Sequence, residues 1–256
     1  MSATSPSVTG IFTPVILPPS TRQASVEGGK LSGVKIPVTD GDIADVALVL
    51  AKEGGKPGLF LVDLTGPGVT REAVKTLDPT RDAAKLTFAG APARRLGGAG
   101  EGLDLLEQIL DRAAVLLAFE QTGGADRCLE MAKDYALERY AFGRTIASYQ
   151  AIKHKLADMY VKNELSRSNA YYGAWALNTN APELPVAASA ARIAGSEAFW
   201  FASKENIQTH GGIGFTWEMD CHLYYRRSRQ LSLVAGAPRV WKERLVSHLE
   251  RRNAAA

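Results

Sequence analysis

The fold is decided by residues 103–117, which read LDLLEQILDRAAVLL. Their apolar residues recur at intervals of three and four, at Leu103, Leu106, Ile109, Leu110, Ala113, Leu116 and Leu117. This interval places them along one side of an α-helix, where they form an apolar stripe suited to packing on other helices. The spacing predicts a long helix that continues toward Tyr140 and ends before Phe142-Gly143.

Three further helices are expected after this one. The second begins near Ser148 and reaches about Asn178, and Pro182 and Pro185 interrupt the connection that follows. Pro185 suits a first helical turn, so an alanine-rich third helix is expected from there to Gln208, ended by Gly211-Gly212. A last helix follows Pro238 and ends near Arg252. Four long helices with short links predict an antiparallel four-helix bundle.

The residues before Gly97-Gly98-Ala99-Gly100 have a different rhythm. Short runs of β-type residues alternate with glycine and proline turns, at 11–17, 30–38, 46–51, 59–64 and 85–88. Several short strands at such spacing are typical of an antiparallel sandwich or barrel. The predicted fold class is therefore α+β, with a β-domain over residues 1–97 and a helical domain over residues 98–252.

Composition is that of an ordinary globular protein. The chain has 256 residues, of which 22% are charged, and a net charge of +3, which does not favour a nucleic-acid binder. The two cysteines, Cys128 and Cys221, lack metal-ligand spacing, and so do the histidines, so no metal site is expected. The N-terminus has no signal-peptide pattern, and no apolar run approaches the ~20 residues of a membrane span. A cytoplasmic protein is expected.

The first segment with chemical content runs from Glu138 to Arg144 and is followed by Gln150. The guanidinium of Arg139 is a planar set of donors suited to phosphate, and Gln150 can hydrogen-bond a ribose or a pyrophosphate. Phe142 can cover an adenine or flavin ring. Taken alone, the segment is equally compatible with an ordinary helix end.

The second segment, Gln208 to Phe215, reads QTHGGIGF. Its glycines permit unusual dihedral angles and let a ligand approach the backbone, whose amides can bind a pyrophosphate. Gly211-Gly212 also serves as a plain helix C-cap, so this segment alone is a weak signal. It is not a Rossmann fingerprint, because a helix precedes it.

Together these segments resemble the acyl-CoA dehydrogenase family. The resemblance covers the chain from about Lys30 onward and rests on the order and spacing of the segments 76–78, 135–143, 156–159, 208–215 and 224–227, together with Arg81 and Gln150. It implies a β-domain followed by an oligomerising four-helix bundle, with FAD bound at a subunit interface. No counterpart of the family's N-terminal helical domain is expected within these 256 residues.

The resemblance also implies which residues contact FAD. Arg139, Phe142 and Gln150 would touch the adenosine-pyrophosphate half of a flavin whose ring lies in the neighbouring subunit. Gln208, Gly211 and Gly212 would contact the same half. Thr39, in the segment 35–39, matches the β-domain threonine that lies beside the flavin ring.

The same comparison finds no catalytic base. The family removes an α-proton with a glutamate and passes the β-hydrogen to the flavin as hydride, giving an enoyl-CoA. The usual glutamate position is Ala235, and the alternative position on the first bundle helix is Ala113. Glu120 lies on the same helix two turns further on and is expected to be a structural or surface carboxylate.

Other departures fall in the β-domain and the last loop. Pro37 stands where an aromatic residue packs on the flavin ring, Ala237 replaces a hydroxyl that helps hold FAD, and residues 13–19 lack the family's acidic-glycine pattern. The resemblance therefore implies a non-catalytic subunit of a heteromeric assembly, α2β2, in which a catalytic acyl-CoA dehydrogenase subunit supplies the base and most of the acyl-CoA site.

Two alternatives remain open from the sequence. The chain could be a self-sufficient homomeric acyl-CoA dehydrogenase with a displaced base such as Glu120. It could also be a non-enzymatic member that binds DNA through a basic group of residues, although the low net charge favours a solvated surface. The group comprises Arg226, Arg227, Arg229, Arg239, Lys242 and Arg244.

Overall fold

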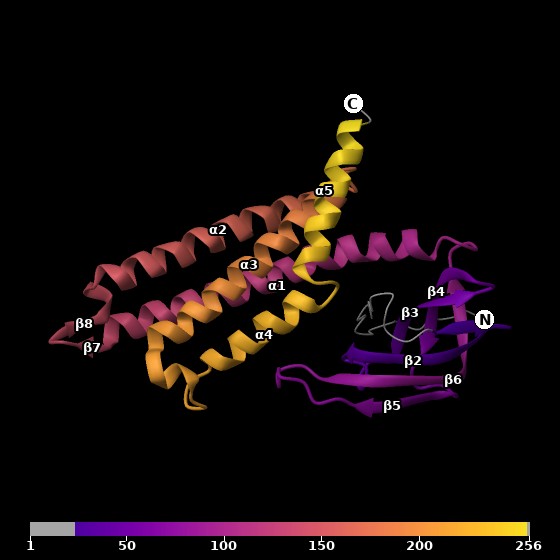
Figure 1. The fold of residues 1–256 in the computed structure, drawn as a ribbon, viewed down its shortest axis with the longest axis horizontal. Helices are drawn as coiled ribbons and strands as arrows, with labels where there is room; N and C mark the ends of the chain where they lie inside the picture. The colour runs from indigo at the N-terminus through magenta and orange to yellow at the C-terminus, as the bar shows by residue number, and fades with distance from the viewer. Residues whose placement is uncertain (1–23, 255–256) are drawn as a thin grey trace, which may run out of the picture. The chain divides into compact units, whose positions relative to one another are not determined.

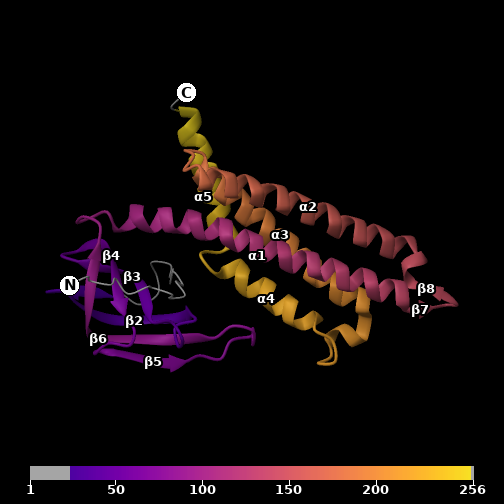
Figure 2. The same ribbon diagram turned by 180° about the vertical axis from the view of Figure 1, so that it is seen from behind.

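The computed structural model describes residues 24–254 (Figures 1 and 2). The sequence segments 11–17 and 13–19 lie outside the described residues. The chain divides into two compact units between Glu107 and Gln108, inside a long helix. The domain boundary at residue 97 stays a prediction.

The first unit is a six-stranded sheet. Its strands are β1 (Ser25–Glu27), β2 (Lys30–Thr39), β3 (Val46–Glu53), β4 (Lys56–Asp63), β5 (Val69–Ala73) and β6 (Ala83–Leu96). They lie in the order β2-β1-β3-β4-β6-β5, and β2 also pairs with β6, so the pairings form a closed circuit. The sheet is antiparallel as predicted, with one short exception, the parallel contact of Ser25 in β1 with Lys52 in β3.

The core of this unit follows from alternation along the strands. Ala47, Val49 and Ala51 of β3 are buried and alternate with more exposed residues. They pack in one cluster with Leu31, Phe60, Leu86 and other buried side chains. Each large apolar side chain removed from water stabilises the unit by about 1.5–3 kcal/mol. The strands predicted at 30–38, 46–51, 59–64 and 85–88 are confirmed as β2, β3, β4 and β6.

Helices make up most of the second unit. They are α1 (Gly102–Glu138), α2 (Gln150–Asn178), α3 (Leu184–His210), α4 (Cys221–Leu233) and α5 (Pro238–Ala254). The three longest run side by side in both ribbon views (Figures 1 and 2). Alanines bury their methyl groups along α3, among them Ala188, Ala191 and Ala198, so neighbouring helices can approach closely.

The four expected long helices are present as α1, α2, α3 and α5, and α4 is a further helix that was not predicted. No apolar stripe marks α4 in the sequence, because its buried residues are Cys221, Ser228, Leu231 and Ser232. The side that faces the core therefore looks polar in the sequence. Ser228 shares a hydrogen bond of 3.0 Å with Ser203 of α3, which satisfies the buried hydroxyls.

Two short features connect the long helices. A hairpin of β7 (Tyr140–Ala141) and β8 (Arg144–Thr145), followed by the 3-10 turn η1 (Ile146–Ser148), links α1 to α2. A second 3-10 turn, η2 (Gly211–Phe215), follows α3. Among residues 24–254, no helix is both long and apolar enough to cross a membrane, and no group of three metal-binding side chains occurs.

Candidate functional site

The hairpin after α1 presents Phe142 to solvent. Tyr140 pairs with Thr145 and Ala141 with Arg144, so only Phe142 and Gly143 form the turn. Both have positive φ, 51° and 78°, the backbone that a tight two-residue hairpin requires. Phe142 is 97% exposed, so its ring has no packing partner among the described residues of its own chain.

Gln150 begins α2, after the hairpin, the turn η1 and Tyr149. Its side chain is exposed, as is that of Arg139 just before the hairpin. The preceding residue, Tyr149, makes no side-chain hydrogen bond to cap the helix. The Ile152 and Lys153 amides donate to the Tyr149 carbonyl. No side chain of Tyr149 caps the two amides before them, which lie at the positive end of the helix dipole and suit an anion. This end of α2 offers what a pyrophosphate needs.

At the end of α3, two neighbouring glycines face open space. Gly211 caps the helix with φ 65°, while Gly212 has an ordinary φ, and a methyl group on either would meet no atom within 4 Å. Gly214 differs, because a methyl group there would lie 2.8 Å from the carbonyl oxygen of Ile207. Backbone conformation thus accounts for Gly211 and packing for Gly214. Gly212 is required neither by its backbone conformation nor by packing. The open space beside it lets a ligand approach the backbone.

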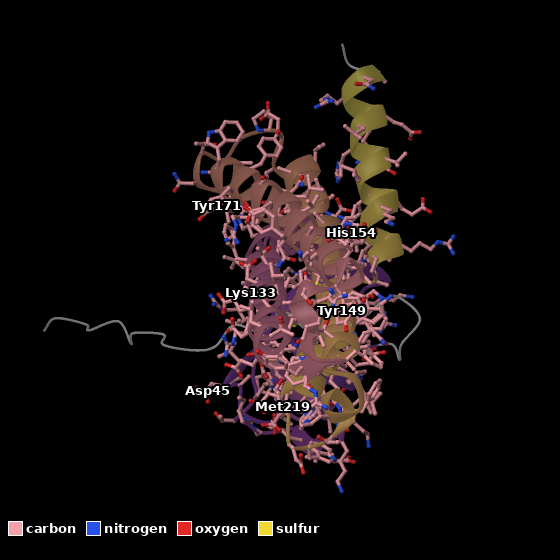
Figure 3. The ribbon with its side chains drawn as sticks, turned by 90° about the vertical axis from the view of Figure 1, so that its left-hand side faces the viewer. Asp45, Lys133, Tyr149, His154, Tyr171 and Met219 are labelled. Atoms are coloured by element: carbon pink, nitrogen blue, oxygen red, sulfur yellow. The ribbon has the colours of Figure 1, made fainter. Side chains whose placement is uncertain are left out.

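The hairpin and the end of α3 lie at the same end of the bundle. Tyr135 of α1 stacks on His210 of α3 with ring centroids 4.2 Å apart. Lys155, in the second turn of α2, pairs with Glu205 of α3 at 3.0 Å. Figure 3 looks at this end, with Tyr149 labelled. The structure therefore brings both sequence segments together, with Gln208 exposed beside the glycines.

His210 takes no direct part in this surface. Its ring is buried, and Nδ1 lies 2.9 Å from the carbonyl oxygen of Asn206, one turn earlier in α3. Together with the stack on Tyr135, this contact gives His210 a structural role at the helix end. Tyr149, which sequence reasoning passed over, makes more specific contacts with the hairpin.

Thr39 belongs to the β unit. It ends β2, pairs with Ala83 of β6 and is half-buried, and Pro37 beside it is exposed. The predicted contact of Thr39 with a flavin ring therefore concerns a separate part of the chain from the six residues of the bundle.

The loop between α4 and α5 carries Ala235, one of the two base positions. Ala235 is 6% exposed with φ 61°, and its carbonyl oxygen accepts a hydrogen bond of 3.1 Å from the Trp241 indole. The buried Arg192 of α3 donates to the carbonyl oxygens of Leu231 and, at 2.6 Å, Val234. Burial lowers the pKa of Arg192 to about 10. Hydrogen bonds from Arg192 and Trp241 to backbone carbonyl groups thus hold this loop, and the side chain at position 235 is only a methyl group.

Ala113 and Glu120 lie on α1. Ala113 is half-buried and carries no proton acceptor. Glu120 forms an ion pair with Arg227 of α4, whose Nη2 and Nε lie 2.6 and 3.1 Å from Oε1. The pair joins α1 to α4 within the bundle. The geometry therefore suits a structural carboxylate.

The basic residues considered for DNA binding all contact groups within the unit. Arg226 lies over Trp217 and Arg229 over Trp200. The other four pair with carboxylates: Arg227 with Glu120, Arg239 with Glu243, Lys242 with Glu197 and Arg244 with Asp111. These contacts give each of the six cations a local partner within the unit.

Comparison with known proteins places this geometry in a family. Residues 100–249 match the family model described as acyl-CoA dehydrogenase, C-terminal domain. Acyl-CoA dehydrogenase IpdE2 of Mycobacterium tuberculosis is 40% identical over 212 residues, which cover 83% of this chain and 59% of the relative. The chain thus spans about 59% of that relative's length.

Two solved structures are similar over most of the chain. A variant of the Tcur3481–Tcur3483 steroid ACAD has a TM-score of 0.81 and 32% identity, covering 92% of this chain and 63% of that one. The ChsE4–ChsE5 complex from Mycobacterium tuberculosis has a TM-score of 0.79 and 26% identity, covering 90% and 62%. On the family match over the bundle, supported by these similarities, the chain belongs to the acyl-CoA dehydrogenase family.

Proposed function

We propose that this chain is a subunit of an FAD-dependent acyl-CoA dehydrogenase assembly that oxidises the α,β-bond of an acyl-CoA thioester. FAD is the cofactor of the family. The end of this chain's bundle that carries the hairpin binds the adenosine-pyrophosphate half of FAD, and the flavin ring lies in a catalytic partner. The partner supplies the base and most of the acyl-CoA pocket, in an α2β2 assembly.

The donor set at the bundle end fits half of a dinucleotide. Phe142 offers an unpaired aromatic face to an adenine, and Arg139 offers a guanidinium to phosphate. Gln150 stands at a helix N-terminus that favours negative charge. Gly211 and Gly212 leave space for a ligand against the backbone. Because these groups point away from their own fold, they are suited to a cofactor held by another chain.

A methyl group at each base position is the observation that carries the non-catalytic role. Bound FAD would supply the acceptor for the β-hydride, whereas removal of the α-proton needs a basic side chain within hydrogen-bond reach. Ala235 and Ala113 provide none, and Glu120 is held by Arg227. This chain can therefore hold and orient a cofactor but has no base at either family position.

The similar structures support a partner of the same family. Both are named by two components, Tcur3481–Tcur3483 and the ChsE4–ChsE5 complex. This chain keeps the residues proposed to contact a partner's flavin and lacks the base. In such a pair, it would complete the flavin site of a catalytic subunit. We therefore assign the partner to the acyl-CoA dehydrogenase family.

Native mass spectrometry after purification from the source cell tests the proposal. The expected complex contains this chain, a second acyl-CoA dehydrogenase chain and FAD, while this chain purified alone is colourless. A pure homo-oligomer that binds FAD and oxidises an acyl-CoA would refute the proposal.

The homomeric alternative needs a displaced base, for which Glu120 is the candidate. Glu120→Gln would then abolish turnover while leaving flavin bound, whereas our proposal expects unchanged turnover in the assembled complex. Glu243→Gln is a matched control, because Glu243 is an exposed carboxylate that also pairs with an arginine, Arg239.

A further inference from the structure

The hairpin that carries Phe142 is too small to be stable by itself. Each strand has two residues, and isolated hairpins of much greater length are only marginally stable in water. Phe142 also adopts a left-handed backbone that is unfavourable for a bulky residue. Such a conformation persists only where surrounding contacts impose it, and it marks a candidate functional position.

Tyr149 supplies those contacts. Its phenol donates a hydrogen bond of 2.9 Å to the carbonyl oxygen of Ala141, the residue before Phe142. The guanidinium of Arg144, on the other side of the turn, lies 3.9 Å from the centre of the Tyr149 ring. One side chain therefore holds both strands of the hairpin, one through its hydroxyl group and the other through its ring.

The same residue connects the hairpin to helix α2. Tyr149 immediately precedes Gln150, and its backbone carbonyl accepts from the amides of Ile152 and Lys153 in the first turn. At the base of the hairpin, the Ile146 amide donates to the Arg139 carbonyl at 2.8 Å. The positions of Arg139, Phe142 and Gln150 are thus linked through a single short segment.

We propose that Tyr149 is a positioning residue, which fixes the Phe142 ring relative to Arg139 and Gln150 so that the three bind one adenosine-pyrophosphate unit. This inference rests on the proposed function, because it names what holds that site in shape. The hydrogen bond from the phenol keeps Phe142 in its left-handed conformation. Without it, the turn relaxes and the ring samples orientations that do not cover the adenine.

Tyr149→Phe tests the role of the hydroxyl group, because the variant keeps the ring beneath Arg144. Hydrogen exchange of the Ile146 amide in the full chain reports hairpin opening, and FAD titration of the co-purified complex reports affinity. We expect exchange and the dissociation constant each to rise about fivefold, as a net hydrogen bond of about 1 kcal/mol implies. Tyr160→Phe is the control, because Tyr160 is an exposed tyrosine in helix α2, which follows Tyr149.

A double-variant cycle separates positioning from a general structural role. If Tyr149 acts through Phe142, then Tyr149→Phe changes FAD affinity in the wild-type background but has no further effect in Phe142→Ala. Equal effects in both backgrounds would overturn the positioning role. So would hairpin exchange in Tyr149→Phe that matches the Tyr160→Phe control.

The proposed function fails in a distinguishable way. In that case Phe142→Ala itself leaves FAD affinity unchanged, and faster hairpin exchange in Tyr149→Phe is then without consequence for FAD. That outcome refutes the cofactor role of the hairpin and, with it, the positioning role of Tyr149.

Discussion

Phe142 combines two features that are each unfavourable for an isolated chain. Its ring is almost fully exposed, and its backbone has φ 51°, which costs about 1–2 kcal/mol for a residue with a side chain. No packing within the described part of the chain offsets this cost. A residue that is disfavoured in the free chain is understandable if it stabilises a complex.

Phe142→Asn should therefore separate stability from binding. Asparagine tolerates the left-handed conformation, and little apolar burial is lost at an exposed site, so the free energy of unfolding should rise by up to about 1 kcal/mol. FAD affinity of the assembled complex should fall, because the ring is gone. Urea unfolding and FAD titration measure the two effects.

Phe215→Asn provides the comparison for this prediction. Phe215 is also an exposed phenylalanine, but its φ is not positive, so its replacement relieves no left-handed backbone. Stabilisation by both substitutions would show that the gain at 142 has another cause. A loss of stability in Phe142→Asn would contradict the strain argument.

Both cysteines should be inert in the native protein. Burial raises the pKa of Cys128 far above its ordinary value and that of Cys221 to about 11. At pH 8 both thiols are therefore protonated, whereas the thiolate is the reactive form. A colorimetric thiol reagent should label neither cysteine until denaturant unfolds the chain. Rapid labelling of the native protein would contradict the buried placement.

The same pKa shifts give stability a pH dependence. The unfolded thiols titrate near pH 8.5, and the folded thiols only above about pH 11 for Cys221. Between these values the native state holds more protons than the unfolded state, so the free energy of unfolding falls as pH rises. The stabilising contribution is complete below about pH 8.5. Unfolding titrations at pH 7 and pH 10 should show a smaller decrease for Cys128→Ala/Cys221→Ala than for wild type.

At the scale of elements, two adjacent glycines in α1 have opposite surroundings. A methyl group at Gly123 would meet nothing within 4 Å, whereas one at Gly124 would lie 2.4 Å from the Phe199 ring of α3. Phe199 is fully buried in the bundle core and has no room to move aside. Gly124 is therefore a packing requirement of the α1–α3 contact, and Gly123 is not.

Alanine at the two positions should accordingly have effects of opposite sign. Gly123→Ala should stabilise the chain by about 0.5–1 kcal/mol through helix propensity. Gly124→Ala should destabilise it by about 1–3 kcal/mol through overpacking. Thermal unfolding of the two variants side by side checks the prediction, and a common sign would show that α1 and α3 do not pack in this way.

Sequence periodicity found the elements whose buried residues are apolar and missed the others. The stripe at 103–117 predicted α1, but α4 buries cysteine and serine, so its inner side has no apolar pattern. Strands β1 and β5 are short and largely exposed, so no clear alternation marks them. The hairpin was not predicted for a different reason: Phe142-Gly143 is not among the usual two-residue turn sequences.

The candidate site was accessible from sequence only in part. The family pattern predicted Arg139, Phe142, Gln150 and the glycines as cofactor contacts, but spacing alone did not place the two segments at one end of the bundle. That proximity depends on tertiary contacts such as the Tyr135–His210 stack. Tyr149 had no motif to mark it, because its contribution is a hydrogen bond to a backbone carbonyl rather than a contact with a ligand.

For the whole molecule, the family's flavin-site residues that are present and those that are absent would serve different flavins. The residues of the bundle end would serve a flavin centred in another chain. An active site around a flavin ring held by this chain would need a base, which Ala235 and Ala113 do not provide. It would also need an aromatic residue over the ring, and Pro37 stands at that position. Thr39 is the exception on that side. The balance of these features predicts that the assembly holds fewer flavins than chains.

One FAD for each pair of chains is therefore the expected stoichiometry. In an α2β2 assembly, two flavins would have their rings in the catalytic subunits and receive Phe142, Arg139 and Gln150 from this chain. Flavin absorbance against protein concentration, together with the intact mass of the native complex, measures the ratio. Phe142→Ala should lower occupancy of both flavins together, because both sites are equivalent by symmetry. Four tightly bound flavins would mean that this chain completes a ring site of its own, and the division of roles drawn from Ala235 and Pro37 would then be wrong.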